Sequence, residues 1–404
     1  MRWNYHVGYY RFLDEVNMNF QLNRFLTIGT ARFEDLEGAA SRITTLADWR
    51  REFLALAEAA DSEGRTLNAM TYFRAAEFFM IDGDPEKGAA YDRFIELFHE
   101  AFADDFREGL IIEERVTYLD GYLPVMRLPS VGEGRAKGTI LVHGGFDSFI
   151  EELYPLFDYF RFRGYDVVAF EGPGQGAALR KCKLSMTHEW ERPVKAVLDH
   201  YGLDDVTLLG ISLGGYLAPR AAAFEPRISR LIAFNVVYDF FEILARRRGW
   251  AFGSVLRLFT SLGLGFLLNP LARLRMRRDP FVEWAMHQGM SVFGVDSPYA
   301  YAQETRKYHT RDISGLITQD VLLTAGSGDH FVPLDLFHRQ GELLTNVRSL
   351  TGRVFTEAEG SQNHCQVGNI LPALEFMADW MDRHTGVRNG ARDAAGEVPV
   401  FRAV

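Results

Sequence analysis

Cysteine is scarce in this sequence, and its first residues have little of the character of a secretion signal. The two cysteines, Cys182 and Cys365, form no metal-type spacing, and so few thiols suggest a reducing compartment. The first residues, MRWNYHVGYYRF, lack the continuous apolar core of a signal peptide. We therefore expect a cytoplasmic protein.

Basic charge is also in deficit. The chain has 44 Lys and Arg residues against 54 Asp and Glu, which gives a net charge of −10. A general nucleic-acid binder needs a basic face, so this balance argues against one. The apolar run at residues 255–268 is interrupted by Arg257 and by glycines, which makes it a poor transmembrane segment. We expect neither a nucleic-acid partner nor a stable membrane span.

Apolar residues, in contrast, are plentiful enough for a large core. They make up 47% of the 404 residues, and 13% of the chain is aromatic, which suits one large domain and a smaller one. Apolar residues recur at helical spacing over residues 46–60, 67–81 and 86–106. We predict an N-terminal helical domain over residues 1–112 and interpret most of its aromatic residues as helix–helix core.

The pattern changes after residue 112. Residues 114–128 resemble a hairpin that turns at Asp120-Gly121, and from residue 138 strands alternate with helices. The strands we expect here lie at residues 139–142, 166–170, 206–209, 228–235, 320–324 and 353–358. This alternation predicts an α/β fold over residues 113–385, with a mostly parallel sheet covered by helices on both faces.

A long insertion interrupts the sheet pattern at residues 238–310. It exceeds an ordinary connection, and we predict a helical lid over the site. Its arginines cluster at residues 246–248 and 273–278; they form a solvated face, or they attract an anionic substrate or a membrane surface. Residues 386–404 have the composition of a loose tail.

The strongest local signal is the Gly-x-Ser-x-Gly motif of residues 210–214. It follows the apolar strand at 206–209 and precedes a helix of small residues, which is the context of a nucleophile elbow. Gly210 and Gly214 leave room for the tight turn that lifts the Ser212 hydroxyl above the sheet. We predict that Ser212 is the nucleophile.

A serine hydroxyl needs a base, and the base needs a carboxylate to orient it. Asp329 follows the strand after the lid, and His364 lies between the final strand and the final helix. We predict these two as the acid and the base, with Asp335 as the alternative acid. Other candidates have less favourable positions: His330, His143 and His309 as bases, and Cys365, which we interpret as a packing residue.

We expect the loop after the first parallel strand to supply the second hydrogen-bond donor of an oxyanion hole. The Leu213 amide would supply one donor, and the amide of Gly145 or Phe146 the other. The second glycine-rich loop, at residues 171–176, does not match the G-x-G-x-x-G pattern, so we expect no nucleotide cofactor.

Five segments together carry a family resemblance. They are G-I-S-L-G-G at residues 210–215, H-G-G-F-D-S-F-I-E-E at 143–152, E-G-P-G-Q-G at 171–176, A-G-S-G-D-H-F-V-P at 325–333 and N-H-C-Q-V-G-N at 363–369. Over roughly residues 40 to 385 the chain resembles the α/β-hydrolases. More narrowly, it is similar to the group with an N-terminal helical domain that includes dihydroxypseudooxynicotine hydrolase, FrsA-like esterases and fungal polyketide-shortening hydrolases.

The resemblance implies a serine hydrolase with a capping helical domain and the triad Ser212, Asp329 and His364. Some members of the group cleave esters, and others cleave a carbon–carbon bond next to a ketone, in some cases with an acidic residue shortly after the sixth strand. Asp239 and Glu242 lie in that neighbourhood but match no firm motif.

Three functions follow from these observations. The first is an esterase or other acyl hydrolase, the second is a C–C hydrolase of β-diketone-type substrates, and the third is a non-catalytic binding protein on the same fold. We expect a small-molecule substrate, no cofactor and no metal, and we leave a homodimer open.

Overall fold

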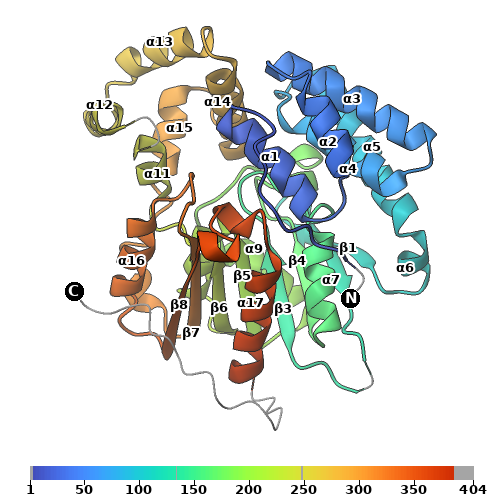
Figure 1. Cartoon of the computed structure of the whole chain (residues 1–404). Helices are drawn as coiled ribbons and strands as arrows, with labels where there is room; N and C mark the ends of the chain where they lie inside the picture. The colour runs from blue at the N-terminus through green and yellow to red at the C-terminus, as the bar shows by residue number, and fades with distance from the viewer. Residues whose placement is uncertain (1–2, 133, 247–248, 386–404) are drawn as a thin grey trace.

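The strand that carries the Gly-x-Ser-x-Gly motif lies in the middle of an eight-stranded sheet. The computed structural model describes residues 3–132, 134–246 and 249–385 (Figure 1). The strands are β1 (Ile112–Tyr118), β2 (Gly121–Leu128), β3 (Thr139–His143), β4 (Asp166–Phe170), β5 (Val206–Ile211), β6 (Ile228–Phe234), β7 (Asp320–Gly326) and β8 (Ser349–Phe355). Their order across the sheet is β1-β2-β4-β3-β5-β6-β7-β8.

The sheet is parallel from β4 to β8, and the expected hairpin forms its antiparallel edge. β1 pairs with β2, and β2 pairs antiparallel with β4, while β3 pairs in parallel with both β4 and β5. All six residues of β5 are buried, as expected for a parallel strand covered on both faces. The predicted α/β fold is therefore confirmed.

Alternate residues of the strands enter two separate hydrophobic cores. Ile140 and Val142 of β3 join the core beneath α7 (Tyr154–Phe162) and α17 (Leu371–His384). Leu141, between them, joins the core on the opposite face. That face is covered by α9 (Glu191–Tyr201), α10 (Gly214–Ala222) and α16 (Leu334–Leu343). A short helix, α8 (Gly176–Arg180), follows β4.

The N-terminal helices continue the first of these cores. They are α1 (Val16–Thr27), α2 (Phe33–Ala40), α3 (Leu46–Ser62), α4 (Thr66–Phe78), α5 (Pro85–Ala101) and α6 (Ala103–Arg107). Trp49 on α3 is completely buried, contacts Phe53 and Phe79, and donates its indole N–H to the Ala75 carbonyl at 2.7 Å. The helices lie beside the upper end of the sheet, and α1 crosses toward the insertion (Figure 1).

The insertion is helical throughout most of its length. It contains α11 (Phe240–Arg246), α12 (Trp250–Ser261), α13 (Gly265–Met276), α14 (Pro280–Phe293) and α15 (Pro298–Thr305). Asp279 and Ser297 cap α14 and α15, and a proline follows each cap at the first helical position. Among the described residues, no helix is both long and apolar enough to cross a bilayer.

One expected strand range needs correction, and two expected segments lie outside the described residues. The last strand was expected at residues 353–358 but occupies Ser349–Phe355. It ends there because Thr356 and Glu359 form a capping box around the short 3-10 turn Glu357–Glu359. The expected tail at residues 386–404 and two arginines of the insertion, at 247–248, lie outside the described residues.

Trp49 provides a test of how strongly the N-terminal helices are packed. We expect Trp49→Ala to lower the free energy of unfolding by about 3–5 kcal/mol, because it opens a cavity and removes the indole hydrogen bond. The measurement is the shift of the urea denaturation midpoint followed by circular dichroism. Glu58→Ala, on the exposed side of the same helix, is the control and should leave the midpoint unchanged. Equal midpoints for both variants would contradict the packing described here.

Candidate active site

Ser212 lies on a strained turn between β5 and α10. Its φ of 61° falls in the left-handed region, which side-chain-bearing residues seldom adopt. The turn is possible only because its neighbours are glycines. A Cβ on Gly210 would approach the Gly214 carbonyl oxygen to 2.1 Å, and one on Gly215 would approach the Asn235 carbonyl oxygen to 2.1 Å. The local sequence therefore fixes the position of the Ser212 hydroxyl.

Two further predicted residues meet this hydroxyl. Ser212 Oγ lies 2.9 Å from His364 Nε2, and His364 Nδ1 lies 2.7 Å from Asp329 Oδ2. His364 and Asp329 are both buried, and they come from the loops after β8 and β7. Asp329 Oδ1 accepts the backbone N–H groups of Phe331 and Val332 at 2.7 and 3.0 Å. These bonds fix the carboxylate so that Oδ2 faces the imidazole.

The two ionisable groups alter each other's protonation. Burial alone would lower the pKa of His364, but the Asp329 carboxylate raises that pKa well above its ordinary value. Burial alone would raise the pKa of Asp329, but the charge of His364 and its hydrogen bonds lower it below its ordinary value. With Nδ1 donating to the carboxylate, Nε2 is the nitrogen that can accept the serine proton.

Asn235 is a site residue that the sequence analysis missed. The expected strand at 228–235 ends at Phe234, and Asn235 follows with a φ of 63°. Its Nδ2 donates to Asp329 Oδ2 at 2.5 Å, and its Oδ1 accepts the Cys365 N–H at 3.1 Å. Asn235 thus connects the acid to the histidine loop. The sequence did offer a signal for it: a polar residue stands at the end of an apolar strand, and asparagine tolerates the left-handed backbone conformation.

The alternative acid and bases lie elsewhere. Asp335 is exposed on the first turn of α16 and pairs with Arg246. His143 is buried beneath the loop after β3, where burial lowers its pKa to about 4. His309 lies in an isolated bridge with Asp239, away from the Ser212 turn. The His330 ring lies against the Phe331 ring beside the site, with ring centroids 3.9 Å apart and an interplanar angle of 40°.

The loop after β3 approaches the Ser212 turn closely. A Cβ on Gly145 would lie 2.6 Å from the Leu213 nitrogen, so glycine is required there. The Gly145 N–H points to Ser148 Oγ at 3.3 Å. In the described part of the chain, neither the Leu213 nor the Phe146 N–H makes an internal hydrogen bond, and both residues line the cavity. Of the two expected second donors, Phe146 is therefore the one with a free amide.

A cavity of about 220 Å³ opens over Ser212 and His364. Its wall combines both parts of the chain outside the sheet: α1 and the end of α4 on one side, and α11, α14 and α15 on the other. Most of the lining is apolar, including Phe20, Phe78, Phe240, Trp284 and Met286. Within residues 60–110, only Phe78 and Phe79 reach the cavity.

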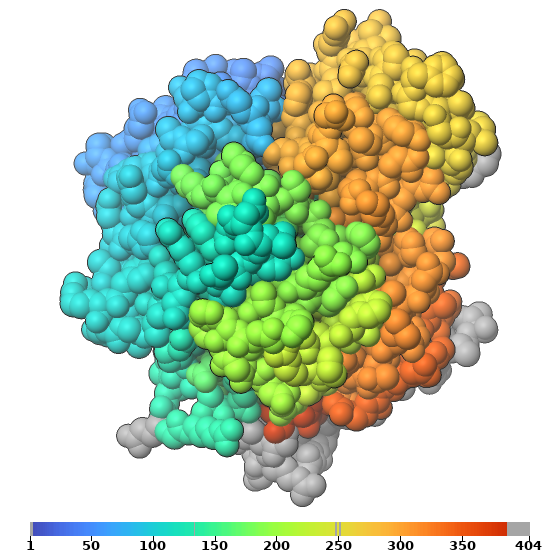
Figure 2. All heavy atoms as spheres, turned by 180° about the vertical axis from the view of Figure 1, so that it is seen from behind, coloured from blue at the N-terminus to red at the C-terminus, as the bar shows by residue number. Residues whose placement is uncertain are grey.

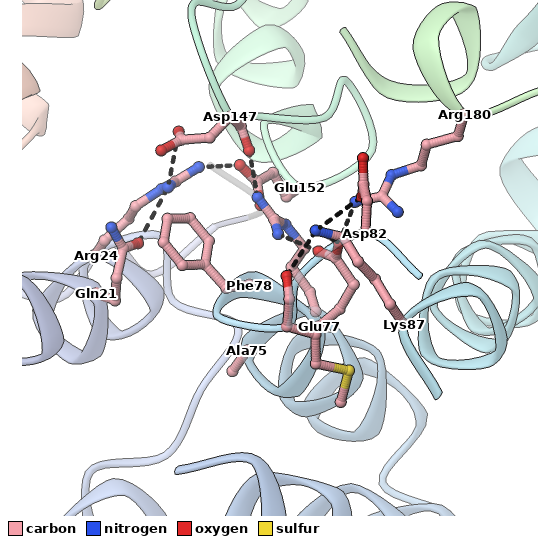
Figure 3. A network of polar contacts seen from close by, with 12 residues as sticks. Gln21, Arg24, Ala75, Glu77, Phe78, Asp82, Lys87, Asp147, Glu152 and Arg180 are labelled. Atoms are coloured by element: carbon pink, nitrogen blue, oxygen red, sulfur yellow. Dashed lines mark hydrogen bonds and ion pairs between the residues drawn. The ribbon is translucent and has the colours of Figure 1, made fainter. Parts of the chain in front are cut away.

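One part of the cavity wall is polar. Asn17, Gln21 and Arg24 of α1 face Asp147 and Ser148 of the loop after β3. Arg24 donates to Gln21 Oε1 at 3.1 Å and to Glu152, and it lies 3.6 Å from Asp147 Oδ1 (Figure 3). Burial raises the pKa of Asp147 above its ordinary value despite the nearby arginines. The cavity therefore presents a cation and a carboxyl group within an apolar enclosure.

The same loop is held by buried charges from the helical layer. Arg74 on α4 donates to Glu152 at 2.5 Å and to the Asp147 carbonyl oxygen. Glu77 pairs with Arg74 at 2.6 Å and also with Arg180 (Figure 3). Burial alone would raise the pKa of Glu77, but the surrounding cations hold it below its ordinary value. We refer to Arg24, Arg74, Glu77, Lys87, Glu152 and Arg180 as the buried ion network.

The acidic residues expected after the sixth strand do not line the cavity. Asp239 accepts the Glu242 N–H at 2.9 Å and Arg311 at 3.1 Å, while Glu242 pairs with Arg246 and Arg257. The carboxyl group that does line it is Asp147. Across the described residues, no group of three or more His, Cys, Asp or Glu side chains has the arrangement of a metal site.

Comparison with known proteins identifies the family of this chain. The model of the alpha/beta hydrolase fold matches residues 140–348. A curated relative, the 20-hydroxy-prefusarin hydrolase FUS2 of Gibberella moniliformis, is 34% identical over 81% of this chain and 84% of its own length. The hydrolase acrC of Aspergillus aculeatus is 29% identical over 84% of this chain and 85% of its own length.

Solved structures share the fold at lower identity. The 2,6-dihydroxy-pseudo-oxynicotine hydrolase superposes with a TM-score of 0.64 at 22% identity, covering 90% of this chain and 95% of its own. AbyA5 gives a TM-score of 0.64 at 18% identity, covering 91% and 96%. With the family match over half of the chain and a relative above 30% identity, the chain belongs to the α/β-hydrolase fold family and is a hydrolase.

Proposed function

We propose that this hydrolase cleaves a carboxylic ester, or a similar acyl bond, through an acyl-enzyme on Ser212. The observation that carries the proposal is the hydrogen-bonded series from Ser212 Oγ to His364 Nε2 at 2.9 Å and from His364 Nδ1 to Asp329 Oδ2 at 2.7 Å. A nucleophile, a base and an orienting carboxylate in this order are the parts that acyl transfer requires.

In the first half of the reaction, Ser212 Oγ attacks the carbonyl carbon while His364 Nε2 takes the hydroxyl proton. Asp329 stabilises the imidazolium that forms, and the Asn235 amide keeps the carboxylate in place. The free N–H groups of Leu213 and Phe146 would bind the oxyanion. His364 then returns the proton to the leaving group. In the second half, water attacks the acyl-enzyme with His364 again as base.

The cavity wall supports a substrate that is mostly apolar and carries one polar or anionic group. Aromatic and aliphatic side chains enclose the space over Ser212, while Arg24 offers a charged donor at one side. The relative named for 20-hydroxy-prefusarin makes a small organic metabolite a reasonable substrate class. No step requires a cofactor or a metal.

We further propose roles for the parts of the chain around the sheet. Residues 1–112 would act as a cap and residues 238–310 as a lid on a catalytic domain of residues 113–385. Both parts contribute side chains to the cavity, among them Phe20 from α1 and Trp284 from α14. Phe20 of α1 also packs near His364, because their ring centroids are 6.2 Å apart.

A second candidate is hydrolysis of a carbon–carbon bond between two carbonyl groups. Here Ser212 would attack one carbonyl, and an enolate would leave in place of an alkoxide. Asp147 favours this candidate, because it lines the cavity and burial raises its pKa above the ordinary value, which favours the protonated form that a general acid needs. Such a proton would be available to the departing enolate.

Removal of the nucleophile is the first test. We expect Ser212→Ala to lower kcat by several orders of magnitude without changing the fold, because only one hydroxyl is lost. The measurement is turnover of an activated ester, with mass spectrometry of the wild-type enzyme to detect an acyl group on the Ser212 peptide. Cys365→Ala is the control, since Cys365 also lines the cavity. Wild-type turnover in Ser212→Ala, or an acyl group on Cys365, would contradict the proposal.

The pH dependence tests the acid and the base. Because neutral His364 is the base and its pKa is raised, kcat/KM should increase with pH and reach half its maximum above pH 6.5. We expect Asp329→Asn to lower the plateau by about 10⁴-fold and to shift the midpoint to lower pH, because the raising carboxylate is gone. Asp335→Asn is the control. A larger effect of Asp335→Asn than of Asp329→Asn would refute the assignment.

Substrate comparison separates the two candidate reactions. The ester reaction predicts turnover of an apolar aryl ester that is little changed by Asp147→Asn. The C–C reaction predicts that a β-diketone is converted to one carboxylic acid and one ketone, with a loss of about a hundredfold in Asp147→Asn. Product analysis by chromatography distinguishes them. Equal losses on both substrates would assign Asp147 to loop structure and remove the support for the second candidate.

A further inference from the structure

Two helices of the insertion turn their large apolar side chains to solvent. On α12 these side chains recur at helical spacing, at Phe252, Val255 and Leu258, and Leu262 continues the series just beyond the helix. On α13 they are Phe266, Leu267, Leu271 and Leu274. All eight are more than two-fifths exposed, and Phe266 reaches 71%. We call these eight residues the outer lid face.

The concentration of such residues is local. Of the fifteen large apolar side chains that are exposed in the described part of the chain, these eight fall within residues 252–274. The segment occupies the outer edge of the molecule in Figure 1 and the upper right corner, in yellow, in Figure 2. Contiguous exposed apolar surface of this kind marks a site that contacts another apolar phase or molecule.

The inner faces of the two helices include small and polar residues beside the buried Met276. Gly253 lies against the Ala245 carbonyl, and Gly265 lies so close to the Tyr299 ring that a Cβ would approach it to 2.7 Å. Asn269 Oδ1 accepts the Tyr299 N–H at 2.9 Å. In an ordinary amphipathic helix the large apolar side chains face inward, whereas here eight of them face outward. The outward side chains are not needed to attach α12 and α13 to the rest of the lid.

Basic residues dominate the charge around the outer lid face, although Arg246 and Arg257 pair with Glu242 and Arg275 pairs with Asp279. Residues 243–278 contain eight arginines and no aspartate or glutamate, although the whole chain carries a net charge of −10. Four of these arginines lie in the last turn of α13 or just beyond it, and all four are exposed: Arg273, Arg275, Arg277 and Arg278. An acidic protein that concentrates arginine beside exposed apolar side chains presents a surface complementary to an anionic, partly apolar partner.

We propose that the outer lid face is a docking surface for an anionic phospholipid bilayer. Leucine and phenylalanine side chains would enter the boundary between headgroups and acyl chains, and the arginines would contact lipid phosphates. The alternative occupant is a second copy of this chain. Charge disfavours it, because a symmetric dimer would bring two arginine-rich, acid-free segments together.

Docking there would place the lipid beside the cavity wall. α13 packs on α14 and α15, which contribute Trp284, Met286 and Tyr301 to the cavity. An apolar substrate that partitions into the bilayer would then be concentrated next to the lid. Docking itself does not depend on the reaction that Ser212 performs.

The test is vesicle co-sedimentation of the full-length protein. We expect binding to phosphatidylcholine vesicles that contain phosphatidylserine, weaker binding to phosphatidylcholine alone, and release by salt. Arg277→Gln with Arg278→Gln should lower the partition coefficient by roughly 30-fold, at about fivefold for each arginine. Phe266→Ser with Leu271→Ser should lower it by at least about tenfold, because both side chains lose burial in the bilayer.

Matched controls lie on other surfaces. Leu119→Ser removes a side chain that is 76% exposed at the hairpin tip, and Arg107→Gln removes an exposed arginine; neither should change binding. Turnover of a soluble ester should stay at the wild-type level in all these variants. The proposal is overturned if anionic vesicles do not bind the protein at low salt, or if the controls reduce binding equally. It is also overturned if sedimentation velocity shows a dimer that Phe266→Ser with Leu271→Ser dissociates and that vesicles do not displace.

Discussion

The left-handed backbone at Ser212 is the constraint on which the rest of the site depends. A residue held at a φ of 61° needs the surrounding structure to fix its backbone. Gly210, Gly215 and Gly145 allow neighbouring backbone segments to come close enough to do so. The same approach brings the loop after β3 against the Leu213 nitrogen. One turn thus positions the hydroxyl, one free amide and the loop that carries the other. The rest of the sheet holds this turn at the carboxyl ends of the parallel strands.

Ser212, Asp329 and His364 could be located from the sequence because parallel strands end at one edge of a sheet. Each lies in the turn or loop that follows a parallel strand, so the segments that carry them converge at one end of the sheet. Their roles stay predictions until turnover is measured. Asn235 could not be assigned in this way, because its function depends on contacts with Asp329 and Cys365, 94 and 130 residues further along the chain.

The first helix, α1, is another element that the sequence analysis did not locate. α1 has apolar residues at helical spacing, at Met18, Leu22 and Phe25, but it also buries three polar ones: Asn19, Gln21 and Asn23. The side chains of Asn19 and Asn23 hold the extended segment before the helix, through the N–H groups of Phe12 and Tyr10. Only the folded chain shows that this helix, rather than residues 60–110, supplies most of the N-terminal part of the cavity wall.

The buried ion network determines how the chain can be divided. Glu152 is a residue of the sheet-bearing part, but the arginines that neutralise it, Arg24 and Arg74, belong to the helical layer. A fragment that starts at residue 113 would lose both cations of Glu152 and would expose the apolar core that the sheet shares with the helical layer. The helical layer is therefore not a removable module. A chimaera that exchanges it for the layer of another hydrolase would have to transfer both sides of the network together.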